Sequence, residues 1–214
     1  MSIWKTKIAS IFPHHYDNRT VNFLERLVSG SGTDVLLKEA LASIKGSEMV
    51  LDIGAGSGRV SIPIARSLTG GHVIALDISP QMLSCLEAEA KKKGIGNKIR
   101  PLLADAASSG LENESVDLVV SNNVLHELAD PQATLLDAFR VLKPGGKIIL
   151  CDFAKNLTWL LMKPFHGKSS HGPLDTEEVK ALLDRAGFDS VRVQRIRLKV
   201  VASAIKPQGN SSSP

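Results

Sequence analysis

The chain has 214 residues, of which 43% are hydrophobic and 22% are charged, and its formal net charge is +4 at neutral pH. This length and apolar content predict one globular domain with its own core and exclude a chain that is disordered throughout. The two cysteines, Cys85 and Cys151, form neither a disulfide framework nor a metal-ligand spacing, so we expect a cytoplasmic protein. No apolar run approaches the roughly 18 residues of a membrane span, and none is expected.

The first part of the chain is expected to form a helical cover, and the second part an alternation of strands and helices. Within residues 1–46, FLERLVSG and DVLLKEALASI have helical periodicity. Strands are predicted at about 49–53, 72–77, 99–104, 116–121 and 146–152, and helices at about 58–68, 80–93, 131–141 and 176–186, with a short element near 106–110. Such alternation is typical of a parallel sheet with helices on both faces.

The last third of the chain departs from this alternation. Residues 154–174 contain one short apolar stretch and a loop rich in His, Gly, Pro and Ser, and a loop of that length is commonly functional. SVRVQRI and RLKVVASAI then predict a final strand pair with an antiparallel edge. The main domain is therefore expected over 47–206, followed by a polar, disordered tail at 207–214.

The segment VLDIGAGSG predicts a strand that ends in a ligand-binding turn. Asp52 is followed by Gly54, Gly56 and Gly58, and then by apolar residues at helical spacing. Glycine lets the backbone turn sharply and approach a ligand, and the next helix directs its unpaired N–H groups there. The dinucleotide fingerprint requires a third glycine where this chain has Arg59, and no Gly-Lys-Ser/Thr of a P-loop follows.

Two further predicted strands also end in an acid. HVIALD ends in Asp77, about 20 residues after the glycines, and IRPLLAD ends in Asp105. Because parallel strands end at the same edge of a sheet, these acids are expected to surround one ligand. A carboxylate at the position of Asp77 can accept hydrogen bonds from both hydroxyls of a ribose.

These motifs together resemble class I S-adenosylmethionine (SAM)-dependent methyltransferases. VLDIGAGSG, ALDISPQML, LLADAASSGLENESVDLVVSNNVLHEL and LKPGGKIILCDF follow one another in that family's order, from about Met49 to about Val201. The whole is similar to the branch of ubiquinone/menaquinone-biosynthesis methyltransferases. The resemblance implies an α/β fold with a doubly wound, mostly parallel, seven-stranded Rossmann-like sheet, and SAM as the cofactor.

The resemblance also implies which residues bind the methionine part of SAM. In the family the first acid anchors the turn and reaches the amino group, which assigns that role to Asp52; the alternative is an acid that caps its own loop. The backbone after the fourth strand lines the methionine, which assigns Asn122. The turn that passes beneath the methionine and sugar consists of Gly54, Ala55, Gly56, Ser57 and Gly58.

The adenosine part of SAM is assigned in the same way. Asp77 binds the ribose hydroxyls, unless it is only a surface acid. Ile78 and Met82 pack on the adenine, although Met82 suits the core equally well. Asp105 matches the family's acid near the adenine amino group, and Ala106 supplies a backbone N–H beside it.

The segment after the fourth strand bears on the methyl acceptor. Enzymes that methylate adenine or amide nitrogen have an Asp/Asn-Pro-Pro-aromatic turn there, whereas this chain has Ser121 to Val124. Cytosine-carbon methylation requires a cysteine at a turn such as Pro-Cys, and Cys151 follows a leucine. Arsenic methylation requires several cysteines, and this chain has two. We therefore expect a small-molecule acceptor.

Histidines are candidates for a general base. His126 follows the fourth strand, His14 and His15 lie in the N-terminal cover, and His166 and His171 lie in the loop after the fifth strand. These segments are predicted to meet near the transferred methyl group, and His126 is the first choice because a strand end holds it most rigidly. The alternatives are polar loop residues that cap nearby backbone, or a metal site of three imidazoles, for which the spacing gives no indication.

A basic stripe near the end of the chain leaves a second class of acceptor open. It consists of Arg192, Arg195, Arg197 and Lys199, and it is interpreted as a charged edge strand or as a phosphate-contacting surface. No aromatic residue interleaves with it. One rival function is therefore methylation of RNA or protein. A second is SAM binding without catalysis. A nicotinamide-dependent oxidoreductase is disfavoured by Arg59. Nucleic acid is not the expected partner, and a homo-oligomer is compatible with the sequence.

Overall fold

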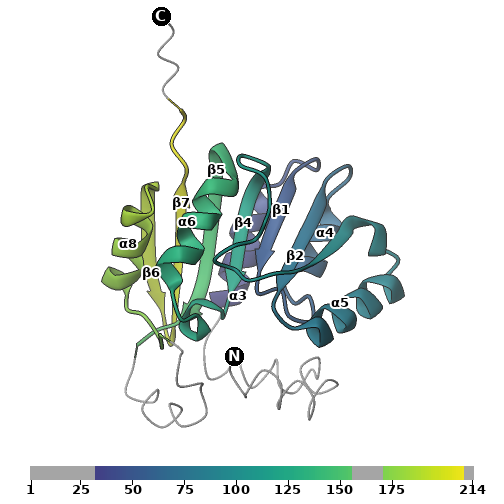
Figure 1. The fold of residues 1–214 in the computed structure, drawn as a ribbon, viewed down its shortest axis with the longest axis horizontal. Coiled ribbons are helices and arrows are strands. Elements are labelled where there is room, and N and C mark those ends of the chain that lie inside the picture. The colour runs from purple at the N-terminus through teal and green to yellow at the C-terminus, as the bar shows by residue number, and fades with distance from the viewer. Residues whose placement is uncertain (1–31, 156–170, 210–214) are drawn as a thin grey trace, which may run out of the picture.

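The computed structural model describes residues 32–155 and 171–209. Its centre is a seven-stranded sheet in the order β3-β2-β1-β4-β5-β7-β6 (Figure 1). The strands are β1 (Met49–Ile53), β2 (His72–Asp77), β3 (Ile99–Leu103), β4 (Val116–Asn122), β5 (Leu142–Phe153), β6 (Asp189–Ile196) and β7 (Lys199–Ile205). The predicted fold class and strand positions are confirmed.

The strand directions bring the strand ends of interest to one edge of the sheet. β1 to β5 pair in parallel, whereas β7 pairs antiparallel with both β5 and β6. The last residues of β1, β2, β4 and β5 therefore share one edge, and the first residue of β7, Lys199, pairs with Phe153 there. The predicted antiparallel strand pair is also confirmed.

Helices cover both faces of the sheet because successive strand residues point to opposite faces. One apolar core lies beneath α6 (Pro131–Val141) and α8 (Thr176–Arg185), and it includes Leu51 and Ile53 of β1. The other lies beneath α3 (Gly32–Ser43), α4 (Ser61–Ser67) and α5 (Pro80–Lys92), and it includes Val50. In Figure 1, α6 and α8 lie in front of the sheet and α3 lies behind it.

The helix ends follow from local chemistry. Ser79 caps α5 through a hydrogen bond from the Met82 N–H, and Asp130 caps α6 in the same way; proline begins both helices. Asp175 and Glu178 form a reciprocal capping box at the start of α8. These caps explain why the sequence located three helix starts correctly.

Three local predictions were wrong. The helix expected from residue 58 begins at Ser61, because the glycine turn extends to that point. Residues 106–110 form no helix; Asp105 and Ser108 make an isolated bridge instead. The strand expected from about residue 146 begins at Leu142 and includes the glycine pair of KPGG, where its pairing with β4 shifts register.

Two other expectations concern segments outside this description. The first predicted helix, FLERLVSG, lies outside the described residues, as does most of the loop at 154–174. The helices of residues 32–155 and 171–209 include none that is long and apolar enough to cross a membrane.

Candidate functional site

The glycine turn lies between β1 and α4, at the carboxyl edge of the sheet. Gly54, Gly56 and Gly58 have φ values of +68°, +54° and +95°, a region that side chains rarely adopt. A Cβ on Gly54 would overlap the side chain of Val124, so glycine is also required there for packing. At Gly56 no described atom lies within 4 Å of the corresponding position. The turn thus presents bare backbone on its open side, as a ligand-binding turn requires.

The carboxylate of Asp77 holds this turn against the end of β2. One oxygen accepts a hydrogen bond from the Gly56 N–H at 2.9 Å, and the other accepts one from the Ser79 N–H at 2.9 Å. Each oxygen retains a second lone pair. Beside Asp77, the apolar side chains of Ile78 and Leu103 are 50% and 60% exposed. A carboxylate beside exposed apolar side chains suits a ribose attached to a flat ring.

Asp52 lies beneath the turn, with 1% of its surface exposed. The Ser61 hydroxyl donates a hydrogen bond of 2.6 Å to it, which connects the end of β1 to the first turn of α4. Burial raises the pKa of Asp52 to about 7, and the charge of Asp77 adds to this effect, whereas hydrogen bonds from Ser61 oppose it. A cationic ligand group nearby would favour the ionised form. The predicted contact with the SAM amino group remains a prediction.

Asp52 should make stability depend on pH. The native state keeps its proton to about pH 7, whereas the unfolded chain loses it near 3.8. Folding therefore takes up a proton between these values, so stability falls as pH rises, by up to about 4 kcal/mol. Asp52→Asn should remove this loss. Urea unfolding at pH 5, 6, 7 and 8 measures it, with exposed Glu112→Gln as the control that should follow the wild type. If the free energy of unfolding depends on pH in the same way in the wild type and in Asp52→Asn, the raised pKa of Asp52 is contradicted.

The remaining predicted cofactor residues surround the same edge. Asp105 is exposed and accepts a hydrogen bond of 2.8 Å from the Ala107 N–H, while Ala106 is buried. Met82 is half-buried at the start of α5. Asn122, also half-buried, accepts a hydrogen bond from the Thr33 hydroxyl at 2.9 Å. Their contacts with a cofactor stay predictions.

His126 forms a buried pair with Asp152. It lies in the short helix η2 (Leu125–Glu127) after β4, and Asp152 lies near the end of β5. The imidazole Nδ1 is 2.6 Å from Asp152 Oδ1, and the backbone N–H of His126 donates to Oδ2 at 3.2 Å. The two side chains are 3% and 6% exposed. A proton on Nδ1, assigned from this contact, leaves Nε2 as the basic nitrogen.

The pair has opposite pKa shifts. Burial alone would lower the pKa of His126, but the charge and hydrogen bond of Asp152 outweigh burial, and Glu127 adds to them, so the pKa is raised. Lys199 acts in the opposite direction. Burial would raise the pKa of Asp152, but the charge of His126 lowers it on balance. The two directions agree on an ion pair when the ring is protonated.

Of the other candidate histidines, the structure describes His171. Its backbone N–H donates to the Leu128 carbonyl, and the next residue, Gly172, donates to the His126 carbonyl, each at 2.9 Å. The segment after β4 and the end of the loop after β5 are therefore in contact, whereas their position near the transferred methyl group stays a prediction. His14, His15 and His166 lie outside the described residues. Within the described part of the chain, no group of three or more His, Cys, Asp or Glu could hold a metal ion.

Lys199 corrects the interpretation of a basic stripe. Arg192, Arg195 and Arg197 are exposed on or beside the edge strand β6, but Lys199 is 1% exposed. Its Nζ lies 2.5 Å from Asn123 Oδ1 and 3.3 Å from the ring centroid of Phe153. Lys199 is the first residue of β7 and pairs with Phe153 of β5. Its side chain therefore packs against the Phe153 ring and does not extend into solvent.

Sequence reasoning therefore missed two charged residues of the site. Asp152 could have been found, because CDF places an acid at the end of the fifth strand, as in three earlier strands. Lys199 had no such signal, since a lysine beside three arginines is typical of an exposed face.

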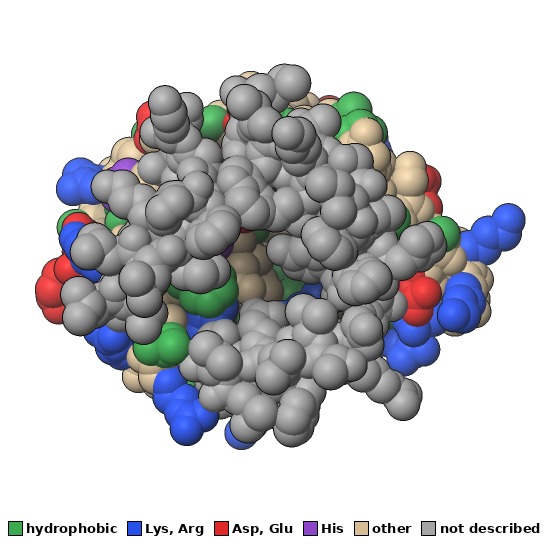
Figure 2. All heavy atoms as spheres, turned by 90° about the horizontal axis from the view of Figure 1, so that it is seen from below, with side chains coloured by type: hydrophobic (Ala, Val, Ile, Leu, Met, Phe, Trp, Pro, Cys, Tyr) green, Lys and Arg blue, Asp and Glu red, His purple; other side chains and the backbone are tan. Residues whose placement is uncertain are grey.

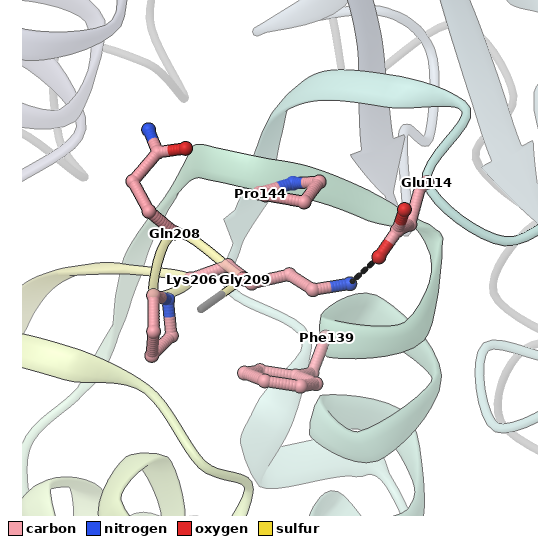
Figure 3. A pocket seen from close by; sticks show the side chains of 7 residues that line it. Glu114, Phe139, Pro144, Lys206, Gln208 and Gly209 are labelled. Carbon is pink, nitrogen blue, oxygen red and sulfur yellow. Dashed lines mark hydrogen bonds and ion pairs between the residues drawn. The ribbon is translucent and has the colours of Figure 1, made fainter. Parts of the chain in front are cut away.

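A hollow of about 360 Å³ lies at the opposite edge of the sheet and is not part of this site. Glu114, Phe139, Pro144, Lys206 and Gln208 are among the residues that line it (Figure 3). Figure 2 views the edge at which the parallel strands end, where Lys and Arg side chains of the described residues are visible around the rim.

Comparison with known proteins agrees with this geometry. Residues 51–150 match the methyltransferase domain family. The arsenite methyltransferase of Halobacterium salinarum is 30% identical over 160 residues, which cover 72% of this chain and 41% of that relative. The demethylmenaquinone methyltransferase of Clavibacter sepedonicus is 28% identical over 206 residues, which cover 84% and 82% of the two chains.

Solved structures show the same fold. A SAM-dependent methyltransferase from Aquifex aeolicus aligns with a TM-score of 0.69 at 23% identity, covering 94% of this chain and 97% of the other. A SAM-dependent methyltransferase from Methanosarcina mazei aligns with a TM-score of 0.66 at 23% identity, covering 78% and 96%. With the sheet order, the glycine turn and the acid at the end of β2, these matches show that residues 51–150 form a methyltransferase domain and that the chain has the fold of class I SAM-dependent methyltransferases.

Proposed function

We propose that this protein transfers a methyl group from SAM to a small-molecule acceptor from which a proton must be removed. The observation that carries the proposal is the buried His126–Asp152 pair beside the end of β4, on the same sheet edge as the glycine turn. Relatives named demethylmenaquinone methyltransferase and ubiquinone/menaquinone biosynthesis C-methyltransferase are consistent with an acceptor of this kind.

The chemistry makes few demands beyond placement and proton removal. Bound SAM would supply a methyl group attached to a positively charged sulfur. When the methyl group is transferred, the sulfur-containing leaving group is neutral. The acceptor atom forms its bond to the methyl carbon as the carbon–sulfur bond breaks. An oxygen or acidic carbon that keeps its proton at neutral pH must lose it to a base. Asp152 would hold the Nδ1–H of His126, so that Nε2 accepts that proton, and the surrounding burial limits competition from water.

Charge and exposure favour a small acceptor over a polymer. The exposed arginines of β6 lie on or beside an edge strand, where charge protects against strand pairing. Among the described residues, the Lys and Arg side chains visible at the carboxyl edge lie around its rim (Figure 2). A nucleic-acid surface would be expected to gather them along one groove.

Transfer of labelled methyl tests the proposal. The protein is incubated with SAM that carries a tritiated methyl group and with a bacterial extract, and label is then measured in the organic-solvent, protein and RNA fractions. We expect label in the organic-solvent fraction, and loss of this label with His126→Gln. Label confined to protein or RNA would contradict a small-molecule acceptor. No transfer to any fraction, with SAM still bound, would favour a non-catalytic SAM-binding module.

A further inference from the structure

Lys199 is a buried cation at the sheet edge that carries the proposed site. It is among the largest fully buried side chains of the described residues. A lysine removed from water is costly unless partners compensate for the lost hydration. Two of its partners belong to the site edge, namely the Asn123 side-chain oxygen and the face of the Phe153 ring. A buried cation in this place needs an explanation beyond packing.

The first partner of Lys199 belongs to an unusual piece of backbone. Asn123 has a φ of +60°, directly after β4, and its N–H donates to the Cys151 carbonyl at 2.7 Å. Asparagine tolerates this left-handed conformation better than most residues, but it still needs support from its surroundings. The hydrogen bond from Lys199 to its side chain supplies support across the sheet, from β7 to the residue that follows Asn122.

The second partner connects Lys199 with His126. The Phe153 ring receives the Lys199 ammonium on its face, and it meets the His126 ring edge-to-face with centroids 5.2 Å apart. Phe153 thus contacts both the cation and the imidazole, whose side chains are buried. In such surroundings a positive charge acts on a neighbouring ring more strongly than it would in water.

We propose that Lys199 is a positioning residue of the methyl-transfer site, which fixes the Asn123 turn and favours the neutral, proton-accepting form of His126. This inference rests on the proposed role of His126 as a base. Among the described residues, the charged groups that act on that imidazole are Asp152 on β5, Glu127 on η2 and Lys199 on β7. The two acids favour the protonated ring, and Lys199 opposes them.

Titration of the His126 ring by NMR tests this inference without any acceptor or cofactor. The resonance is assigned by its loss in His126→Gln. In Lys199→Met, which removes the charge and keeps an apolar stem, the pKa of His126 should rise by at least about 0.3 pH unit. Lys199→Gln should raise it as well, while its amide can still donate to Asn123. Lys199→Arg keeps the charge and should titrate close to the wild type.

Lys206 provides a matched control. It is 8% exposed, and its Nζ lies 4.9 Å from the Phe139 ring centroid (Figure 3). It follows the last residue of β7, at the opposite edge of the sheet. Lys206→Met should leave the titration of His126 unchanged. If both neutral variants of Lys199 titrate like the wild type, the inference is overturned, even if Lys199→Met alone fails to fold. If the proposed function itself is wrong, the labelling experiment shows it by the absence of label in the organic-solvent fraction. The titration of His126 does not depend on that result.

Discussion

Replacing His126 by glutamine should lower the turnover number with the true acceptor by about 10²–10⁴-fold, because the proposed base is lost. The affinity for SAM should change little, since the glycine turn and Asp77 are untouched. The pKa of His126 is raised above its ordinary value of 6.5, and the ring must be neutral to accept a proton. The wild-type rate should therefore rise with pH, with a midpoint above 6.5, and the variant should lose this dependence.

Two further variants make the interpretation specific. Asp152→Asn removes the charge that raises the pKa of His126, so the midpoint should move to lower pH. His72→Gln changes an exposed histidine at the opposite edge of the sheet and should leave both rate and pH profile unchanged. If His126→Gln stays within threefold of the wild type between pH 6 and 8, the buried pair only connects η2 to β5, and the acceptor needs no base.

Removing the Asp77 carboxylate should weaken cofactor binding by about 1.5–3 kcal/mol, which is roughly 10- to 150-fold in the dissociation constant. The reason is the loss of charge-assisted hydrogen bonds to the ribose hydroxyls. Titration calorimetry of Asp77→Ala with S-adenosylhomocysteine, the demethylated product, measures this change. An unchanged dissociation constant would mean that Asp77 does not bind the ribose.

The structure changes one part of this expectation. The sequence places Asp77 at the end of a strand, and that position alone predicts little effect on folding when the carboxylate is removed. Its two hydrogen bonds to backbone N–H groups, from Gly56 and Ser79, now predict reduced stability as well. Glu48→Ala is the matched control, because Glu48 also accepts hydrogen bonds from two backbone N–H groups, those of Lys45 and Gly46, before β1. It should reduce stability without weakening cofactor binding.

The parts of the fold that local chemistry determines could be predicted from sequence. Buried parallel strands appear as short apolar runs, and the helices that follow Ser79, Asp130 and Asp175 begin at recognisable caps. The start of α4 was misplaced by three residues, because glycine spacing does not reveal how far a turn with positive φ values continues.

The parts of the site that depend on strand pairing could not be predicted with the same certainty. His126 was a candidate, but its carboxylate partner comes from β5, 26 residues away. Lys199 was assigned to a surface stripe because its burial depends on the antiparallel register of β5 and β7, which pairs it with Phe153. Such contacts between distant segments have no local sequence pattern.

The most direct measurement of the central claim is cofactor binding by the unmodified protein. Thermal unfolding is followed with SAM, S-adenosylhomocysteine or NAD at equal concentration. A ligand that binds the native state raises the melting temperature by mass action. We expect SAM to raise it, S-adenosylhomocysteine to raise it further, and NAD to leave it unchanged. Stabilisation by NAD alone would contradict the assignment of the glycine turn to SAM, and with it the proposed methyl transfer.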